Sequence, residues 1–206
     1  MALAYTGPDM RDALRNLLEF DARLARIVSA TTEPMLGQMR LAWWRDTLGR
    51  PVHERPAGDA VLDALGARWD GGEAALIALT DGWERMLEEP PLTQSSARAF
   101  AEARCEAMLA AHGVSHTDSE SAAFHTTAWR WALADFAAQV SRDDERDGLV
   151  KLGLGDGAPN PRLPRHSRGL AVLGALGLRS LRAGGRPLME GRGAAAVALK
   201  AAVFGR

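Results

Sequence analysis

The sequence predicts an all-α protein organised as a single domain, and three observations support this. The chain is rich in Ala, Leu, Arg and Glu, which favour helices, and alternating Val, Ile and Thr runs are nearly absent. Segments with apolar residues three and four positions apart follow one another, separated by Gly and Pro. No internal repeat or low-complexity linker marks a boundary, so we expect one domain over residues 1–206.

The predicted elements form a bundle of seven or eight helices. They cover about residues 8–28, 34–48, 59–68, 73–87, 94–111, 118–140, 164–182 and 193–204. Pro34 suits the first turn of the second helix, and Gly49-Arg50-Pro51 ends that helix. Residues 141–162 are polar and rich in Gly, Pro and Asp, which predicts a loop, although residues 148–154 could form a helical turn.

The charge is unevenly distributed along the chain. The net charge is -1, yet residues 151–206 contain ten Lys and Arg against two acidic residues, a net charge of +8. Either this basic end packs near the acidic remainder, or it attracts phosphates, an acidic partner or a negative membrane face. No nucleic-acid reader motif accompanies the charge, so we expect no nucleic-acid partner.

The cysteine count and the apolar runs bear on location. Cys105 is the only cysteine, so no disulfide can form within the chain and a reducing compartment fits. The apolar stretch 170–181 is interrupted by Arg179 and is shorter than the roughly 20 apolar residues of a membrane-spanning helix. We expect a cytoplasmic protein, and peripheral contact with a membrane stays open.

Generic catalytic signatures are absent from the sequence. The five histidines have no metal-ligand spacing, and no second cysteine is present to pair with Cys105. Cys105 follows Arg104, which could lower the pKa of its thiol, but the favoured interpretation is a small buried residue.

The first two helices carry the least generic features. Asp21 interrupts an apolar seam that includes Leu17 and Leu24, so its side chain is expected to point inward. In the second helix, Trp43-Trp44 lies between Arg40 and Arg45, and Gly37 indicates a close helix–helix approach. Composition alone also fits a core helix with two large anchors and surface arginines.

These two helices resemble the N-terminal region of the squalene/phytoene synthase family. The similarity lies in LLEFDARLARIV (17–28) followed by EPMLGQMRLAWWRD (33–46), with weaker matches at 101–104, 128–135 and 191–193. It is closest to the divergent bacterial branch and to the related mitochondrial complex I assembly factor.

The resemblance implies an isoprenoid-synthase-like bundle around a central cavity that holds prenyl chains. In the family, two aspartate-rich motifs on facing helices hold Mg²⁺, which binds the substrate diphosphates. A leaving diphosphate needs this neutralisation of its charge, and Mg²⁺ prefers oxygen ligands.

This sequence departs from the family at those metal-binding positions. The first aspartate pair is replaced by Ala25-Arg26, with Ser29 one turn later. Asp21 and Asp135 are the carboxylates left in the two regions, and both are candidate metal ligands. A structural role, with Arg40 as a partner for Asp21, is the competing interpretation.

Two functions follow from the resemblance. The favoured one is a catalytically degenerate protein that binds a prenylated lipid or acts as an assembly or scaffold protein for a protein partner, without a cofactor. The alternative is an active Mg²⁺-dependent head-to-head prenyl transferase acting on prenyl diphosphates. The candidate cavity and diphosphate-binding residues are Asp21, Arg40, Trp43, Trp44, Arg45 and Asp135.

Overall fold

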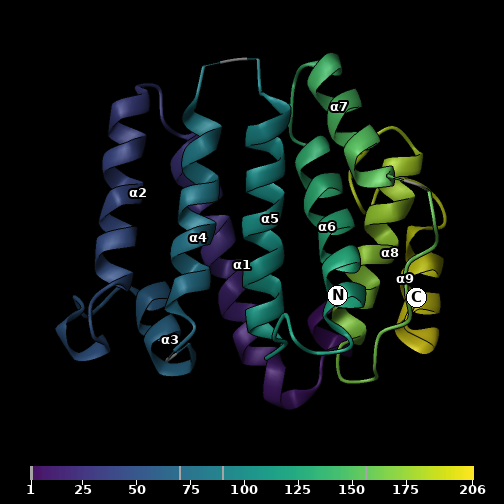
Figure 1. The fold of residues 1–206 in the computed structure, drawn as a ribbon, viewed down its shortest axis with the longest axis horizontal. Coiled ribbons are helices and arrows are strands. Elements are labelled where there is room, and N and C mark those ends of the chain that lie inside the picture. Colours follow the sequence, from purple (N-terminus) through teal and green to yellow (C-terminus); the bar gives the residue numbers. More distant parts are fainter. Residues whose placement is uncertain (1, 70, 90, 156) are drawn as a thin grey trace. The chain divides into compact units, whose positions relative to one another are not determined.

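The computed structural model describes residues 2–69, 71–89, 91–155 and 157–206, and these residues form nine α-helices and no β-strand (Figure 1). The all-α class predicted from the sequence is therefore confirmed. The α-helices are α1 Pro8–Ser29, α2 Pro34–Leu48, α3 Ala60–Arg68, α4 Glu73–Glu84, α5 Gln94–Ala111, α6 Ser121–Ala137, α7 Asp143–Leu154, α8 Arg168–Arg182 and α9 Ala194–Phe204. Short 3₁₀ helices cover η1 Ala2–Tyr5, η2 Val52–Glu54 and η3 Arg85–Leu87.

The additional helix is α7, so the loop predicted over residues 141–162 is wrong for residues 143–154, whereas the helical turn considered for residues 148–154 is present as the second half of α7. The first turn of α7 contains Asp143, Asp144 and Glu145 and its last turn contains Lys151, so the charges complement the helix dipole. Arg146 also donates to the carbonyl oxygen of Val140 at 2.8 Å, which ties α7 to the preceding turn.

The chain divides into two compact units. Unit 1 comprises Met1–Met10 and Gly113–Arg206 and contains α6 to α9, whereas unit 2 comprises Arg11–His112 and contains α2 to α5 with most of α1. The assignment of all 206 residues to one functional domain stays a prediction.

The core of unit 2 is built from α1, α2, α4 and α5. The ring centroids of Phe20 on α1 and Trp44 on α2 lie 5.0 Å apart. Gly82 allows α4 to approach α5 closely, since a Cβ at this position would lie 2.7 Å from the Cβ of Ala103. A Cβ at Gly37 would lie 2.8 Å from Cδ1 of Leu87 in η3, so the close approach predicted at this glycine is present.

The core of unit 1 is organised around α8. Its Gly177 faces α6 so closely that an added Cβ would lie 2.8 Å from the carbonyl oxygen of Arg130. On another side, α9 packs against α8. The start of α8 is covered by η1, and an isolated antiparallel bridge joins Thr6 to Ser167.

Candidate functional site

Asp21 lies buried in unit 2, on the face of α1 that the apolar seam predicts. Its neighbours in that seam, Leu17 and Leu24, are 2% and 0% exposed, and Asp21 itself is only 6% exposed. A carboxylate in such surroundings requires a donor or a cation close by.

Two residues from α4 and α5 satisfy this carboxylate. The indole Nε1 of Trp83 donates to Oδ1 of Asp21 at 2.8 Å, and Nη2 of Arg104 donates to Oδ2 at 2.5 Å. The Nε of Arg104 also approaches Oδ1 at 3.3 Å. Arg104 is 4% exposed, and its guanidinium lies over the ring of Phe100 at 5.3 Å. The result is a buried, hydrogen-bonded ion pair that joins three helices.

The predicted pairing of Asp21 with Arg40 is wrong. Arg40 lies on the exposed side of α2, whereas Arg104 projects from a stripe of α5 that is otherwise apolar. The buried Arg104 on α5 therefore neutralises the buried Asp21 on α1. Arg104 and Trp83 are the residues that the sequence interpretation missed.

The α1 face does not fit a Mg²⁺ site. Both oxygens of Asp21 already accept hydrogen bonds from the guanidinium of Arg104, and Oδ1 also accepts one from Trp83. One turn further along α1 are Ala25 and the exposed Arg26, and Arg26 would repel a divalent cation. A cation at Asp21 would have to displace the Arg104 charge from a buried position.

Asp135 belongs to α6 in unit 1. It is half-buried, and Nε2 of Gln139 donates to its Oδ2 at 3.1 Å. Asp21 lies in unit 2, so a site shared by Asp21 and Asp135 stays a prediction, as does the central cavity.

The paired tryptophans of α2 have different environments. Trp44 is 3% exposed and packs on Phe20, whereas Trp43 is 43% exposed and contacts Trp44 edge-on with centroids 5.2 Å apart. One tryptophan anchors α2 to the core, and the other lies on its outer face.

Arg45 is held by two carboxylates of α4. Its guanidinium pairs with Asp81 at 2.6 Å and with Glu84. Burial by itself lowers the pKa of Arg45, but the hydrogen bonds to Glu84 and Asp81 outweigh burial and raise the pKa above its usual value. Diphosphate would therefore compete with two carboxylates for Arg45.

The outer face of α2 presents a group of large apolar side chains, which we call the α2 surface. Its members are Met35, Leu36, Met39 and Trp43, which are 72%, 46%, 64% and 43% exposed. Exposed groups of large apolar residues are uncommon and mark contact sites. Methionine and tryptophan are also enriched where proteins meet.

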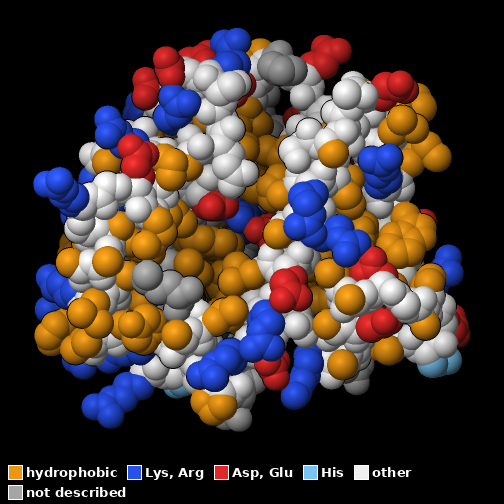
Figure 2. Space-filling model, turned by 180° about the vertical axis from the view of Figure 1, so that it is seen from behind, with side chains coloured by type: hydrophobic (Ala, Val, Ile, Leu, Met, Phe, Trp, Pro, Cys, Tyr) orange, Lys and Arg blue, Asp and Glu red, His pale blue; other side chains and the backbone are white. Residues whose placement is uncertain are grey.

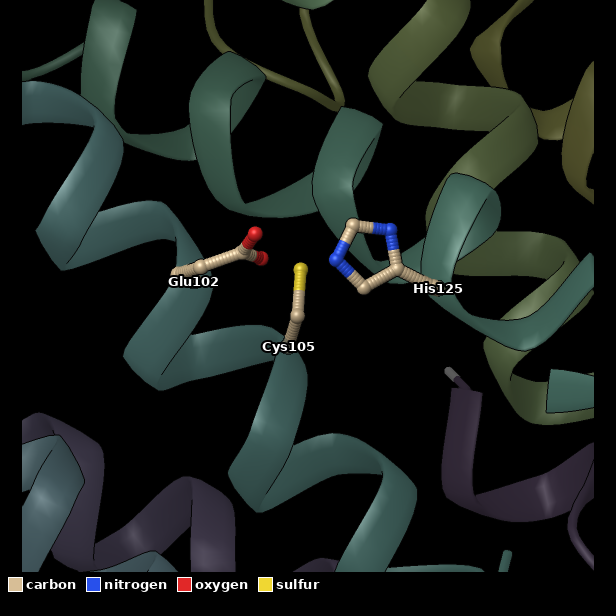
Figure 3. A group of neighbouring side chains, drawn as sticks. All are labelled: Glu102, Cys105 and His125. Atoms are coloured by element: carbon tan, nitrogen blue, oxygen red, sulfur yellow. The ribbon is translucent and has the colours of Figure 1, made fainter. Parts of the chain in front are cut away.

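Cys105 is buried at 0% exposure and lies one turn from Glu102 on α5 (Figure 3). Burial, with the nearby Glu102 and Glu106 carboxylates, raises the pKa of its thiol well above the usual value. The lowered pKa considered from its arginine neighbour is therefore wrong. His125, also labelled in Figure 3, belongs to unit 1, where its ring stacks on Trp129 with centroids 5.8 Å apart.

The described residues define an all-helical protein in which the buried Asp21 carboxylate is paired with an arginine and the helix α2 exposes a group of large apolar side chains. The sequence model of the family described as squalene/phytoene synthase matches residues 1–104. The chain therefore belongs to the squalene/phytoene synthase family. No curated protein and no solved structure matches it. Within the part of the chain that the structure describes, no helix is long and apolar enough to cross a membrane.

Proposed function

We propose that this protein is a catalytically degenerate member of the squalene/phytoene synthase family that works by binding another protein, as an assembly or scaffold factor. The observation that carries the proposal is the ion pair of Asp21 with Arg104, supported by the indole N–H of Trp83.

The argument against catalysis is electrostatic. A diphosphate leaves only when divalent cations or equivalent charges neutralise it. Asp21 uses its negative charge to balance a buried arginine, and Arg26 adds a positive charge on the same helix. Breaking a buried pair by removing one partner costs about 3–5 kcal/mol, and Mg²⁺ binding at Asp21 would meet a cost of this order.

The α2 surface supports the binding role. It combines two methionines and a tryptophan with the exposed Arg40 at its border, a composition enriched at protein–protein interfaces. Trp44 and the Arg45 ion pairs fix α2 on the core, so the surface is presented on a rigid helix.

Incubation of the purified protein with Mg²⁺ and farnesyl or geranylgeranyl diphosphate tests the absence of catalysis. We expect diphosphate release no faster than in buffer with Mg²⁺ alone. Release at an enzymatic rate that is lost in Asp21→Asn would refute the proposal and restore the prenyl transferase alternative.

Site-specific photocrosslinking in cells tests the binding role. A photoreactive residue at Met39 is expected to give one discrete protein adduct, and Trp43→Ser in the same chain should abolish it. The same probe at the exposed Ala99 on α5 is the matched control and should give no such adduct. If the adduct still forms in the Trp43→Ser variant, the α2 surface is not the site of the protein contact.

A further inference from the structure

The helix α9 turns its small side chains inward. The fully buried residues that α9 contributes to its cluster with α8 are alanines, the half-buried Val197 packs against them, and the larger buried residues come from α8. An alanine buries far less apolar area than a leucine or a phenylalanine. The inner cluster consists of Val172, Leu176, Ala194, Ala198 and Ala201.

Three of the four larger apolar side chains of α9 are on its outer face, and the fourth, Val197, is half-buried. Leu199, Val203 and Phe204 are 57%, 58% and 55% exposed. A helix that served only the core would bury these residues in preference to alanine. The outer face of α9 is therefore suited to a second apolar environment.

The charges within the segment that contains α9 are all positive. Residues 191–206 contain Arg192, Lys200 and Arg206 and no acidic residue. Glu190, just before this segment, pairs with Arg186 at 3.7 Å. The lower left of Figure 2, on the side where α9 lies, shows hydrophobic side chains beside Lys and Arg and no Asp or Glu.

More positive charge lies at the carboxyl end of α9. The backbone N–H of Leu163 donates to the carbonyl oxygen of Gly205 at 2.9 Å, which places the segment 162–168 against this end. The segment adds three arginines, Arg162, Arg165 and Arg168.

Arg168 is a covered cation at this end of α9. It is 7% exposed, its Nη1 has no hydrogen-bond partner, and none of its nitrogens forms an ion pair within the described part of the chain. Burial, and then the nearby Arg162 and Arg165, lower its pKa below the usual value. An anion brought to this end of α9 would offset that cost.

We propose that the outer face of α9 and the adjoining segment 162–168 form a docking surface for an anionic lipid bilayer. The helix lies in the plane of the interface, with Leu199, Val203 and Phe204 in the acyl boundary and the exposed basic residues at lipid phosphates. At 11 residues, α9 is about 16 Å long, which suits a helix lying on a bilayer.

The sign of the charges on each surface indicates whether a bilayer or a protein binds there. An anionic bilayer is negative over its whole surface, so it complements a patch of a single positive sign. The α2 surface differs in this respect, because Glu33 and Asp46 lie on α2 or beside it together with Arg40. The mixed charges fit a protein partner on α2, and the uniform charges fit lipid on α9.

Sedimentation with vesicles tests the proposal. The protein should bind vesicles of equal parts phosphatidylcholine and phosphatidylglycerol, bind phosphatidylcholine alone much more weakly, and dissociate as NaCl is raised. Leu199→Gln with Val203→Gln should weaken binding at least about tenfold, and Lys200→Gln about fivefold. Both sites are exposed, so the variants should retain the far-UV circular dichroism of the wild type.

Matched variants in unit 2 serve as controls. Met35→Gln with Met39→Gln changes apolar residues that are at least as exposed as Leu199 and Val203, and Arg50→Gln removes an exposed charge. Both should bind vesicles like the wild type. The α2 variants affect the proposed protein contact, and the α9 variants affect binding to lipid vesicles. The proposed function and the bilayer-docking surface can therefore fail independently of each other.

Four results would overturn the docking surface. The first two are absence of sedimentation with either vesicle and unchanged binding of the Leu199/Val203 variant. The third is displacement by inorganic phosphate beyond the effect of NaCl at equal ionic strength, which would indicate a site for the free ion, and the fourth is a dimer in sedimentation velocity that the Leu199/Val203 variant abolishes, which would assign the face to a second copy.

Discussion

Replacing Asp21 with asparagine removes the negative charge from the buried pair and keeps the shape of the side chain. The indole N–H of Trp83 retains an oxygen acceptor, so the change isolates the interaction with Arg104. The guanidinium, 4% exposed, is then left without its counter-ion.

The expected loss is about 3–5 kcal/mol in the free energy of unfolding, the cost of an uncompensated buried charge. This is a large fraction of the 5–15 kcal/mol that stabilises an ordinary domain. By contrast, Asp12→Asn breaks exposed pairs with Arg15 and Arg68 and should cost less than about 1 kcal/mol.

Urea unfolding followed by circular dichroism measures both values in Mg²⁺-free buffer. The double variant Asp21→Leu with Arg104→Met replaces both charges with apolar groups and should recover much of the loss. The reasoning is refuted if Asp21→Asn is as stable as the wild type, or if the wild type gains stability from Mg²⁺ and this variant does not.

Three further predictions concern other parts of the chain. Burial raises the pKa of Asp59, but the hydrogen bond from Arg23 and those from the first turn of α3 outweigh burial and leave the pKa below its ordinary value of 3.8. Asp59→Ala should therefore destabilise the protein by about 1–2 kcal/mol at neutral pH, and the difference should shrink as the pH falls below 3.8 in urea titrations. Cys105, whose thiol pKa is raised by burial, should react with a thiol reagent such as DTNB only after denaturation. Gly177→Ala should destabilise by about 1–3 kcal/mol because its Cβ would meet α6, whereas Gly148→Ala, with open space around it in α7, should stabilise by up to about 1 kcal/mol; thermal unfolding compares the two.

The sequence was sufficient to predict the helical class because helix periodicity and Gly or Pro punctuation are local signals. It also placed Asp21 inward, since this residue interrupts a seam of leucines. The signal was incomplete at α7: a helical turn was considered for residues 148–154, but the polar, Gly-, Pro- and Asp-rich composition of residues 141–162 favoured a loop. In the structure, a Cβ at Gly153 would lie 2.8 Å from Leu181, so this glycine is a packing residue.

The partners of Asp21 could not be obtained from local patterns. Trp83 and Arg104 lie 62 and 83 residues further along the chain, and their meeting depends on how α4 and α5 pack on α1. The sequence also did not show which of Trp43 and Trp44 is buried, because by spacing alone either residue fits the face of α2 that packs on the core.

The most direct test of the central claim is calorimetric titration of Mg²⁺ into the protein in the presence of a non-hydrolysable prenyl thiodiphosphate. If the Asp21 carboxylate serves Arg104, no saturable Mg²⁺ binding will depend on Asp21, and the wild type and Asp21→Asn will give the same heats. Saturable Mg²⁺ binding that disappears in Asp21→Asn would contradict the account.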